Sequence, residues 1–210
     1  MTVPRFPVYI FDIDGTLLDS AADICGAVRD VLAPAARSAV TEEYLRSFIG
    51  HHLIDLFSDL FPGNTPEYYD ELVRRYRAVY PARGHKSTRL YPDVAETVAQ
   101  LGGRKTTATT KGTPTARAVL EQFGLLPYFD HVQGTDGFPC KPAPDVIHRA
   151  LQAIGAAPED CLLVGDSSPD MEAGRRAGVK LCAVRYGYGD QKEMARWQPD
   201  YWIDGIAELL

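Results

Sequence analysis

Two aspartates, Asp12 and Asp14, stand directly after the apolar run Val-Tyr-Ile-Phe at residues 8–11. Side chains alternate between the two faces of a strand, so Asp12 and Asp14 point the same way and Ile13 points the other way. Two adjacent like charges make each other harder to ionise unless a cation or a reaction requires them. The pair therefore predicts a metal-assisted nucleophile beside a general acid/base.

A turn follows the two aspartates. Gly15 allows the backbone to bend sharply and to approach an anion closely, and Thr16 adds a hydroxyl group. Gly15 is therefore a candidate substrate-binding residue next to the predicted nucleophile.

Other predicted strands are also followed by polar residues. Thr109, Thr110 and Lys111 follow one strand, and residues 165–170, Gly-Asp-Ser-Ser-Pro-Asp, follow another. Lys141 lies in a proline-rich loop before a helix. Ligands of parallel α/β sheets bind at the carboxyl ends of the strands. We therefore expect these residues to form one site with Asp12 and Asp14.

The chemistry of this set points to phosphate. A phosphate group beside Asp12 would be repelled, so catalysis requires a metal ion, a lysine and hydroxyl or backbone donors. The sequence offers all three. Asp12, Asp166 and the backbone carbonyl of Asp14 would make a hard, all-oxygen site suited to Mg²⁺.

Hydrophobic periodicity divides the chain into two kinds of region. Residues 7–11 read as a strand, and the pattern from there to about residue 83 is helical. From residue 91 onward helices and strands alternate, which predicts a doubly wound parallel sheet. The expected fold is α/β, with a core of residues 1–18 and 84–210 and a small all-helical domain, residues 19–83, inserted after the first strand.

Individual elements follow from the same pattern and from capping residues. Thr65 and Pro66 are a typical N-cap and first helical residue, and Pro34 interrupts the helical region. Helices are expected at 21–32, 41–49, 52–61, 66–80, 93–101, 114–123, 144–154 and 169–177, with a short one near Gln191. Later strands are expected at 105–109, 161–164 and 179–184, and near His131 and Tyr201.

Composition is that of a globular enzyme, with 210 residues, 45% hydrophobic and 24% charged. The formal charge of −6 argues against a nucleic-acid or membrane-surface binder, since both need basic faces. The four cysteines are far apart, so we expect reduced thiols and no disulfide framework or zinc site. The sequence shows no signal peptide or membrane span, so cytoplasmic residence is expected. Monomer and dimer both remain open.

The ordered motifs resemble the haloacid dehalogenase-like hydrolase superfamily, and within it the phosphoglycolate phosphatases with a helical (C1-type) cap. Residues 12–16 (Asp-Ile-Asp-Gly-Thr) resemble the first motif, and residues 109–111 (Thr-Thr-Lys) the second. Residues 141–144 (Lys-Pro-Ala-Pro) resemble the third motif, and residues 165–170 the fourth. The similarity covers nearly the whole chain and implies that residues 19–83 form a cap over the site.

The resemblance also implies roles. Asp12 would attack phosphorus to form an aspartyl-phosphate, while Asp14 would protonate the leaving alcohol and then activate water. Thr109 and Lys141 would hold the transferring phosphoryl group. Asp166 would bind Mg²⁺ directly, and Asp170 would support the metal.

One position narrows the expected chemistry, and two others depart from the family pattern. Asp14 favours phosphate esters or anhydrides, because dehalogenating relatives usually carry tyrosine there and phosphonate-cleaving relatives a small residue. Thr110 stands where related phosphatases usually have asparagine, and Gly112 also departs from the commoner pattern. These differences affect the neighbouring hydrogen bonds and leave the reaction class unchanged.

Structural alternatives exist for several of these residues. Thr109 could satisfy a local backbone amide, and Lys141 could be a solvated loop lysine. Asp170 could cap the helix that Pro169 begins. Lys111 could meet phosphate or only solvent, so Thr110 and Lys111 are candidate substrate-binding residues.

The predicted cap should choose the substrate. His51, beside His52 in a loop between cap helices, is a candidate substrate contact, whereas His52 fits a helix start with an exposed ring. A basic cluster reads mostly as a solvated face, one member of which could steer an anionic substrate. Its members are Arg74, Arg75, Arg77, Arg83, Lys86 and Arg89.

The expected function is that of a Mg²⁺-dependent phosphatase acting on a small phosphate monoester, with 2-phosphoglycolate as the leading substrate. Pyrophosphatase, nucleotidase and sugar-phosphate phosphatase activities are the alternatives on the same fold. A catalytically silent binding protein is a further alternative, although such a protein would not need both Asp12 and Asp14.

Overall fold

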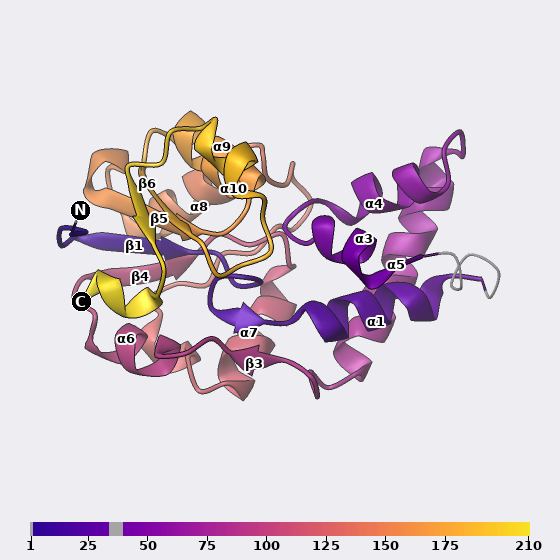
Figure 1. The fold of residues 1–210 in the computed structure, drawn as a ribbon, viewed down its shortest axis with the longest axis horizontal. Helices are drawn as coiled ribbons and strands as arrows, with labels where there is room; N and C mark the ends of the chain where they lie inside the picture. Colours follow the sequence, from indigo (N-terminus) through magenta and orange to yellow (C-terminus); the bar gives the residue numbers. More distant parts are fainter. Residues whose placement is uncertain (1, 34–39) are drawn as a thin grey trace.

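A parallel sheet of five strands, in the order β4-β1-β5-β6-β7, forms the larger of two bodies in the computed structural model, which describes residues 2–33 and 40–210. Pro34 lies outside the described residues. The second body is helical and lies beside the sheet body (Figure 1). All four strand pairings are parallel, as predicted. The strands are β1 (Val8–Phe11), β4 (Arg104–Thr107), β5 (Cys161–Gly165), β6 (Lys180–Val184) and β7 (Tyr201–Ile203).

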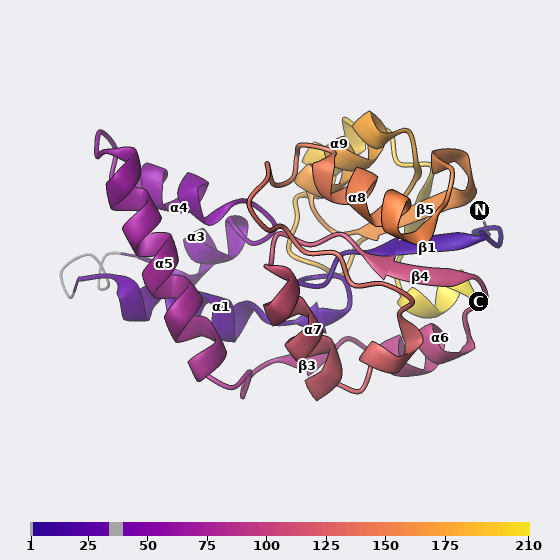
Figure 2. The same ribbon diagram turned by 180° about the vertical axis from the view of Figure 1, so that it is seen from behind.

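Helices cover both faces of this sheet, and alternating strand residues contact the two layers. Tyr9 and Phe11 pack in one apolar cluster with residues of α6 and α7, whereas Val8 and Ile10 pack in another with residues of α8 and α9. The two helical layers are visible on opposite sides of the sheet in Figure 2. The helices of this body are α6 (Val94–Gln100), α7 (Thr113–Gln122), α8 (Asp145–Ile154), α9 (Ser168–Ala177) and α10 (Gln191–Ala195), with short 3-10 turns at Leu126–Tyr128, Pro158–Asp160 and Ile206–Leu209.

The helical body has an apolar cluster of its own, to which Cys25, Leu45, Phe57 and Tyr76 contribute. Each of these residues comes from a different helix, so burying one apolar face of each helix holds the body together. Its helices are α1 (Ala21–Val31), α3 (Glu42–Ser47), α4 (Leu53–Leu60) and α5 (Pro66–Ala82).

Two short antiparallel strands, β2 (Leu18–Asp19) and β3 (Arg89–Leu90), join the two bodies. They carry the chain out of the sheet body and back into it. Two-residue strands leave no periodic signal in a sequence, which is why this pair was not predicted.

The expected strand near His131 is wrong. The segment does run beside β4, but the Thr107 hydroxyl donates to the Gln133 carbonyl at 3.0 Å and accepts from the Gln133 amide at 2.8 Å. Hydrogen bonds from the Thr107 side chain thus replace some of the backbone hydrogen bonds of a regular strand pair, and residues 131–133 do not form a strand. The other elements agree with expectation to within a few residues, and the α/β fold is confirmed.

No helix among residues 2–33 and 40–210 is long and apolar enough to cross a membrane. The four cysteines are free thiols; Cys25, Cys161 and Cys182 are buried and Cys140 is half-buried.

Candidate active site

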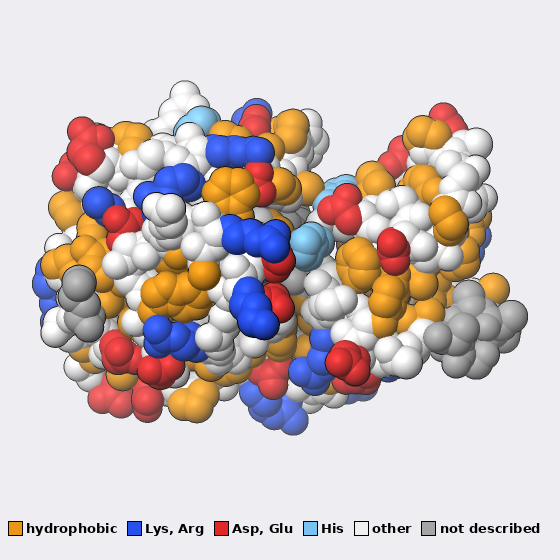
Figure 3. Space-filling view, turned by 45° about the horizontal axis from the view of Figure 1, so that its top comes forward, with side chains coloured by type: hydrophobic (Ala, Val, Ile, Leu, Met, Phe, Trp, Pro, Cys, Tyr) orange, Lys and Arg blue, Asp and Glu red, His pale blue; other side chains and the backbone are white. Residues whose placement is uncertain are grey.

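The carboxyl ends of three adjacent strands bring the predicted residues together. β1 lies between β4 and β5, so the residues that follow these strands meet at one edge of the sheet. Asp12 and Asp14 come from β1, Thr109 to Lys111 from β4, and Asp166 to Asp170 from β5. The helical body faces this edge, and the surface is notched where the two bodies meet, with histidine side chains beside the notch (Figure 3).

Three carboxylates form an acidic cluster at this edge. Oxygen atoms of Asp12, Asp166 and Asp170 lie within 4.8 Å of one another, and no residue of the three is more than 2% exposed. Burial raises the pKa of Asp12 to about 7, and the nearby charges of Asp170 and Asp14 add to this effect. Burial also raises the pKa of Asp166 well above its usual value. The raised pKa values mean that ionising Asp12 and Asp166 is less favourable in this site than in water.

Lys141 supplies one positive charge to this cluster. Its Nζ lies 2.8 Å from Asp12 Oδ1 and 2.5 Å from Asp170 Oδ1, and it donates to the carbonyl of Ala108 at 2.9 Å. Burial lowers the pKa of Lys141, but attraction by the two carboxylates outweighs burial, so its pKa is raised and it stays charged. In the described part of the chain, Lys141 is the ammonium that contacts this cluster, so two of the three carboxylates have no counter-charge when all three are ionised.

A divalent cation fits this arrangement. The cluster offers only oxygen donors, which suit Mg²⁺, and the charge of the ion equals the uncompensated charge. Asp166 is oriented by a hydrogen bond to each oxygen: Thr16 Oγ1 donates to Oδ1 at 3.0 Å, and the backbone amide of Tyr188 donates to Oδ2 at 2.8 Å. The carboxylate of Asp14 is not a member of the cluster among the described residues. Its backbone carbonyl remains the predicted contribution to the metal.

Glycines allow the backbone to close around Asp166. Gly15 has a φ of +86°, and a Cβ there would lie 2.1 Å from Asp166 Oδ2. A Cβ on Gly187, in the loop after β6, would lie 2.2 Å from the Cβ of Asp166. This loop was not predicted from the sequence, although Gly187, Tyr188 and Gly189 follow a predicted strand, as Asp12 and Asp166 do.

Asp170 caps α9, as one of its two alternatives predicted, and its support of a metal stays a prediction. Its Oδ2 accepts from the backbone amide of Ser167 at 3.0 Å and from the Ser167 hydroxyl at 2.5 Å, which makes a capping box at the start of α9. Its Oδ1 contacts Lys141. The helix cap therefore fixes the carboxylate that holds the lysine.

Asp14 forms a second charged group with Lys111. Lys111 Nζ lies 2.7 Å from Asp14 Oδ2, and both side chains are 8% exposed. Lys111 also donates to Tyr80 Oη at 2.9 Å, and its Nζ is 4.3 Å from the centre of that ring. The Ser20 hydroxyl donates to Asp14 Oδ1. Tyr80 belongs to α5 and Ser20 precedes α1, so the helical body holds the predicted acid/base; sequence analysis did not find either residue.

Thr109 is fully buried, and its Oγ1 accepts from the backbone amide of Lys111 at 3.2 Å. The local hydrogen bond considered for Thr109 is therefore present. Its contact with a phosphoryl group stays a prediction.

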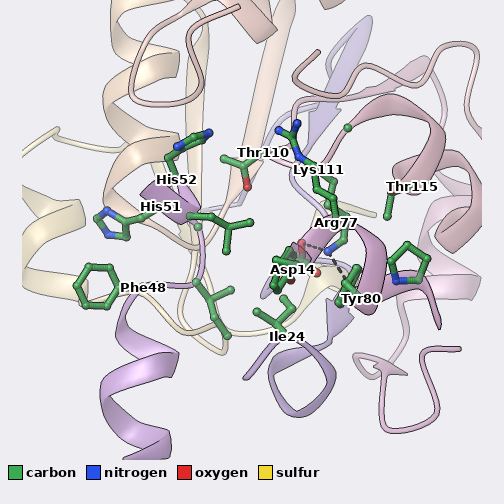
Figure 4. A pocket seen from close by; sticks show the side chains of 16 residues that line it. Asp14, Ile24, Phe48, His51, His52, Arg77, Tyr80, Thr110, Lys111 and Thr115 are labelled. Atoms are coloured by element: carbon green, nitrogen blue, oxygen red, sulfur yellow. Dashed lines mark hydrogen bonds and ion pairs between the residues drawn. The ribbon is translucent and has the colours of Figure 1, made fainter. Parts of the chain in front are cut away.

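A cavity of about 90 Å³ lies between the two bodies. Figure 4 shows Asp14 at its floor, Lys111 and Tyr80 on one side, and His51 and His52 on the other. Thr110 also lines the cavity. The predicted acid/base and the candidate substrate-binding residues Thr110, Lys111 and His51 therefore share one small space.

The two histidines differ. His51 is exposed, with its ring centre 6.1 Å from that of Phe48. His52 is half-buried and caps α4: its Nδ1 accepts from the amide of Ile54 at 3.2 Å. Burial lowers the pKa of His52, so its ring is neutral near pH 7. The interpretation of His52 as a helix start is confirmed, but its ring is less exposed than expected.

A buried carboxylate cluster at a strand-end edge, faced by an inserted helical body, defines the chain as an α/β protein with a candidate enzyme active site. Residues 9–184 match the family model "Haloacid dehalogenase-like hydrolase". The chain belongs to this family, as its motifs predicted.

Relatives and solved structures agree. The chain is 33% identical to a phosphoglycolate phosphatase of Vibrio vulnificus, over 100% of this chain and 97% of the relative. It is 30% identical to the pyrophosphatase PpaX of Bacillus velezensis, with the same coverage of 100% and 97%. A haloacid dehalogenase-like family hydrolase from Streptococcus pneumoniae superposes with a TM-score of 0.84 at 29% identity, covering 97% of this chain and 96% of that one.

Proposed function

We propose that the protein is a Mg²⁺-dependent phosphatase that works through an aspartyl-phosphate on Asp12, with 2-phosphoglycolate as its substrate. The observation that carries this proposal is the acidic cluster, in which Lys141 balances only one of three buried carboxylates. A divalent cation would let these carboxylates ionise together, and a cation beside a carboxylate nucleophile suits phosphoryl transfer.

The chain is a phosphatase of the haloacid dehalogenase-like hydrolase family. The metal, the covalent intermediate and the substrate are the specific parts of the proposal.

In the first step, a carboxylate oxygen of Asp12 bonds to phosphorus while the bond from phosphorus to the leaving oxygen breaks. Asp14, as the neutral acid, gives its proton to that oxygen, so the leaving group departs as an alcohol. Lys141 and the Thr109 hydroxyl stabilise the charge on the phosphoryl oxygens. Mg²⁺ held by Asp12, Asp166 and the Asp14 carbonyl, with Asp170 in support, would supply further positive charge.

In the second step, Asp14, now a carboxylate, takes a proton from water as the water oxygen attacks phosphorus. The bond between phosphorus and the Asp12 oxygen breaks, which releases phosphate and restores both aspartates to their starting states. Lys111, 2.7 Å from Asp14, keeps the side chain in place in both protonation states.

We also propose the domain division expected from the sequence, with residues 1–18 and 84–210 as the catalytic core and 19–83 as a cap. The separate apolar cluster of the helical body supports it. The β2 and β3 pair, where the chain crosses between the bodies, is the expected place of any cap motion.

The size of the cavity beside Asp14 favours a substrate with a small leaving group. A cavity of about 90 Å³ has room for a few water molecules or a group of similar size. The carboxymethyl part of 2-phosphoglycolate and the second phosphate of pyrophosphate are of this order, whereas a nucleoside is much larger. Relatives named phosphoglycolate phosphatase and pyrophosphatase make pyrophosphate the second candidate.

A substrate panel tests the proposal. Phosphate release is measured from 2-phosphoglycolate, pyrophosphate, nucleotides and sugar phosphates, with Mg²⁺ and with a chelator. We expect Mg²⁺-dependent turnover with preference for 2-phosphoglycolate, and none by Asp12→Asn. Substantial activity of Asp12→Asn would overturn the mechanism. A preference for pyrophosphate would replace the substrate, and no turnover on any compound would favour a silent binding protein.

We keep cytoplasmic residence as part of this proposal, because four unpaired thiols suit a reducing compartment. Fractionation of the cells that express the protein tests it.

A further inference from the structure

The members of the basic cluster noted in the sequence differ in their contacts; Arg89, for example, donates to the backbone carbonyls of Lys86 and Thr88. Arg74 and Arg75 both pair with Glu71 on the surface of α5. Arg83 pairs with Asp30 and approaches Asp23. Arg77, on the same helix as Arg74 and Arg75, instead lines the cavity over Asp14. Within residues 2–33 and 40–210, no carboxylate pairs with Arg77.

The cavity therefore carries an excess of positive charge. In the described part of the chain its charged lining residues are Asp14, Lys111 and Arg77, and Asp14 is already paired with Lys111. The two lining histidines provide no negative charge to balance Arg77. Arg77 is exposed at the edge of this cavity, so its guanidinium is open to water and able to form charge-assisted hydrogen bonds to an anion that enters the cavity.

The position of Arg77 suits the leaving group rather than the transferred phosphate. Phosphorus must lie at Asp12, whereas the cavity begins at Asp14, which protonates the leaving oxygen. Figure 4 shows Arg77 and Lys111 on the same side of the cavity. Arg77 also lines an adjoining hollow of about 590 Å³, so it stands where the two spaces meet. An anionic group attached to the leaving oxygen would extend from Asp14 toward Arg77.

We propose that Arg77 determines substrate specificity by binding a second anionic group, a carboxylate or a second phosphate, carried by the leaving group. This inference rests on the proposed function and refines it, since it selects doubly anionic small substrates over phosphate esters with neutral leaving groups. 2-Phosphoglycolate and pyrophosphate both meet the requirement, and p-nitrophenyl phosphate does not.

The test compares kcat/KM for 2-phosphoglycolate, pyrophosphate and p-nitrophenyl phosphate in the wild type, Arg77→Gln and Arg77→Lys. A hydrogen-bonded charge pair of this kind contributes about 10- to 100-fold. We expect Arg77→Gln to lower kcat/KM for the preferred anionic substrate, relative to p-nitrophenyl phosphate, by that factor, mainly through KM. Arg77→Lys should recover part of the loss. The anionic substrate whose ratio falls identifies the group that Arg77 binds.

Arg75→Gln is the matched control, because Arg75 lies on the same helix but pairs with Glu71 at 58% exposure. It should leave the substrate ratios unchanged. Equal effects of Arg77→Gln on all three substrates, or no effect, would overturn the inference while leaving the phosphatase mechanism intact.

A binding measurement keeps the inference testable without turnover. In the Asp12→Asn background, calorimetry gives the Kd of 2-phosphoglycolate, pyrophosphate and inorganic phosphate. Adding Arg77→Gln should weaken one of the first two by at least about tenfold and leave inorganic phosphate unaffected. Unchanged affinities for both doubly anionic compounds would refute the role of Arg77 even if the wild type hydrolysed none of them.

Discussion

Lys111 Nζ lies 2.7 Å from Asp14 Oδ2 and 2.9 Å from the hydroxyl of Tyr80, so one ammonium group joins the predicted acid/base to the helical body. Lys111 follows β4 of the sheet body and Tyr80 belongs to α5. The position of the acid/base therefore depends on how the two bodies are docked. An open arrangement would remove Tyr80 from Lys111 and leave Asp14 less well held.

We expect Tyr80→Phe to reduce kcat by about 3- to 10-fold, because one hydrogen bond to a buried charged group is lost while the ring remains. Steady-state kinetics measures the loss. Tyr69→Phe, also on α5, removes a hydroxyl bonded to the Phe61 carbonyl and should change stability only. The same kinetic loss in both variants would contradict the role of Tyr80.

Lys141→Met should destabilise the protein by about 3 kcal/mol in chelator at pH 7, because Asp12 and Asp170 would be left buried without a counter-charge. Urea denaturation measures the loss. The double variant Lys141→Met with Asp12→Asn should recover part of it, since one buried charge is gone. If the changes in the free energy of unfolding caused by the two substitutions are additive, Lys141 and Asp12 do not stabilise each other as their contact indicates.

Stability without metal should fall as the pH rises from about 4 to 7. The pKa of Asp12 is about 7 in the folded protein against 3.8 ordinarily, so the folded state binds more protons than the unfolded state in this interval. More bound protons in the folded state mean that stability decreases with pH. Thermal denaturation in chelator at several pH values tests this.

Millimolar Mg²⁺ should reduce this pH dependence, because the cation favours the ionised carboxylates. Zn²⁺ or Ca²⁺ at the same concentration allows ion preference to be compared. A melting temperature that does not respond to Mg²⁺ at pH 7 would argue against the metal site.

Gly187→Ala should weaken Mg²⁺ binding at least about tenfold, because its Cβ would lie 2.2 Å from the Cβ of Asp166 and would displace a predicted ligand. Mg²⁺ titration of activity or of melting temperature measures the change. A Cβ on Gly205 has nothing within 4 Å, so Gly205→Ala is the control. Unaltered Mg²⁺ affinity in Gly187→Ala would show that the loop does not position Asp166.

The sequence was sufficient for the local elements and for the residues at the strand ends. Apolar runs such as residues 8–11 and caps such as Thr65 with Pro66 are short-range signals. The rule that ligands gather at the ends of parallel strands was enough to predict that Asp12, Lys141 and Asp166 share one site. The prediction of a strand near His131 was wrong because the Thr107 side chain forms the hydrogen bonds to Gln133, and periodicity does not reveal such side-chain pairing.

The α/β fold, the family and the acidic residues of the candidate site could thus be predicted from the chain alone, since each depends on motifs or periodicity. Which of these charges are balanced depends on how the chain packs in three dimensions. The contacts of Lys111 with Asp14 and Tyr80, and the position of Arg77 on the cavity rather than against Glu71, depend on the docking of two bodies. Residues far apart in the chain meet there through packing, and packing leaves no spacing that a sequence can show.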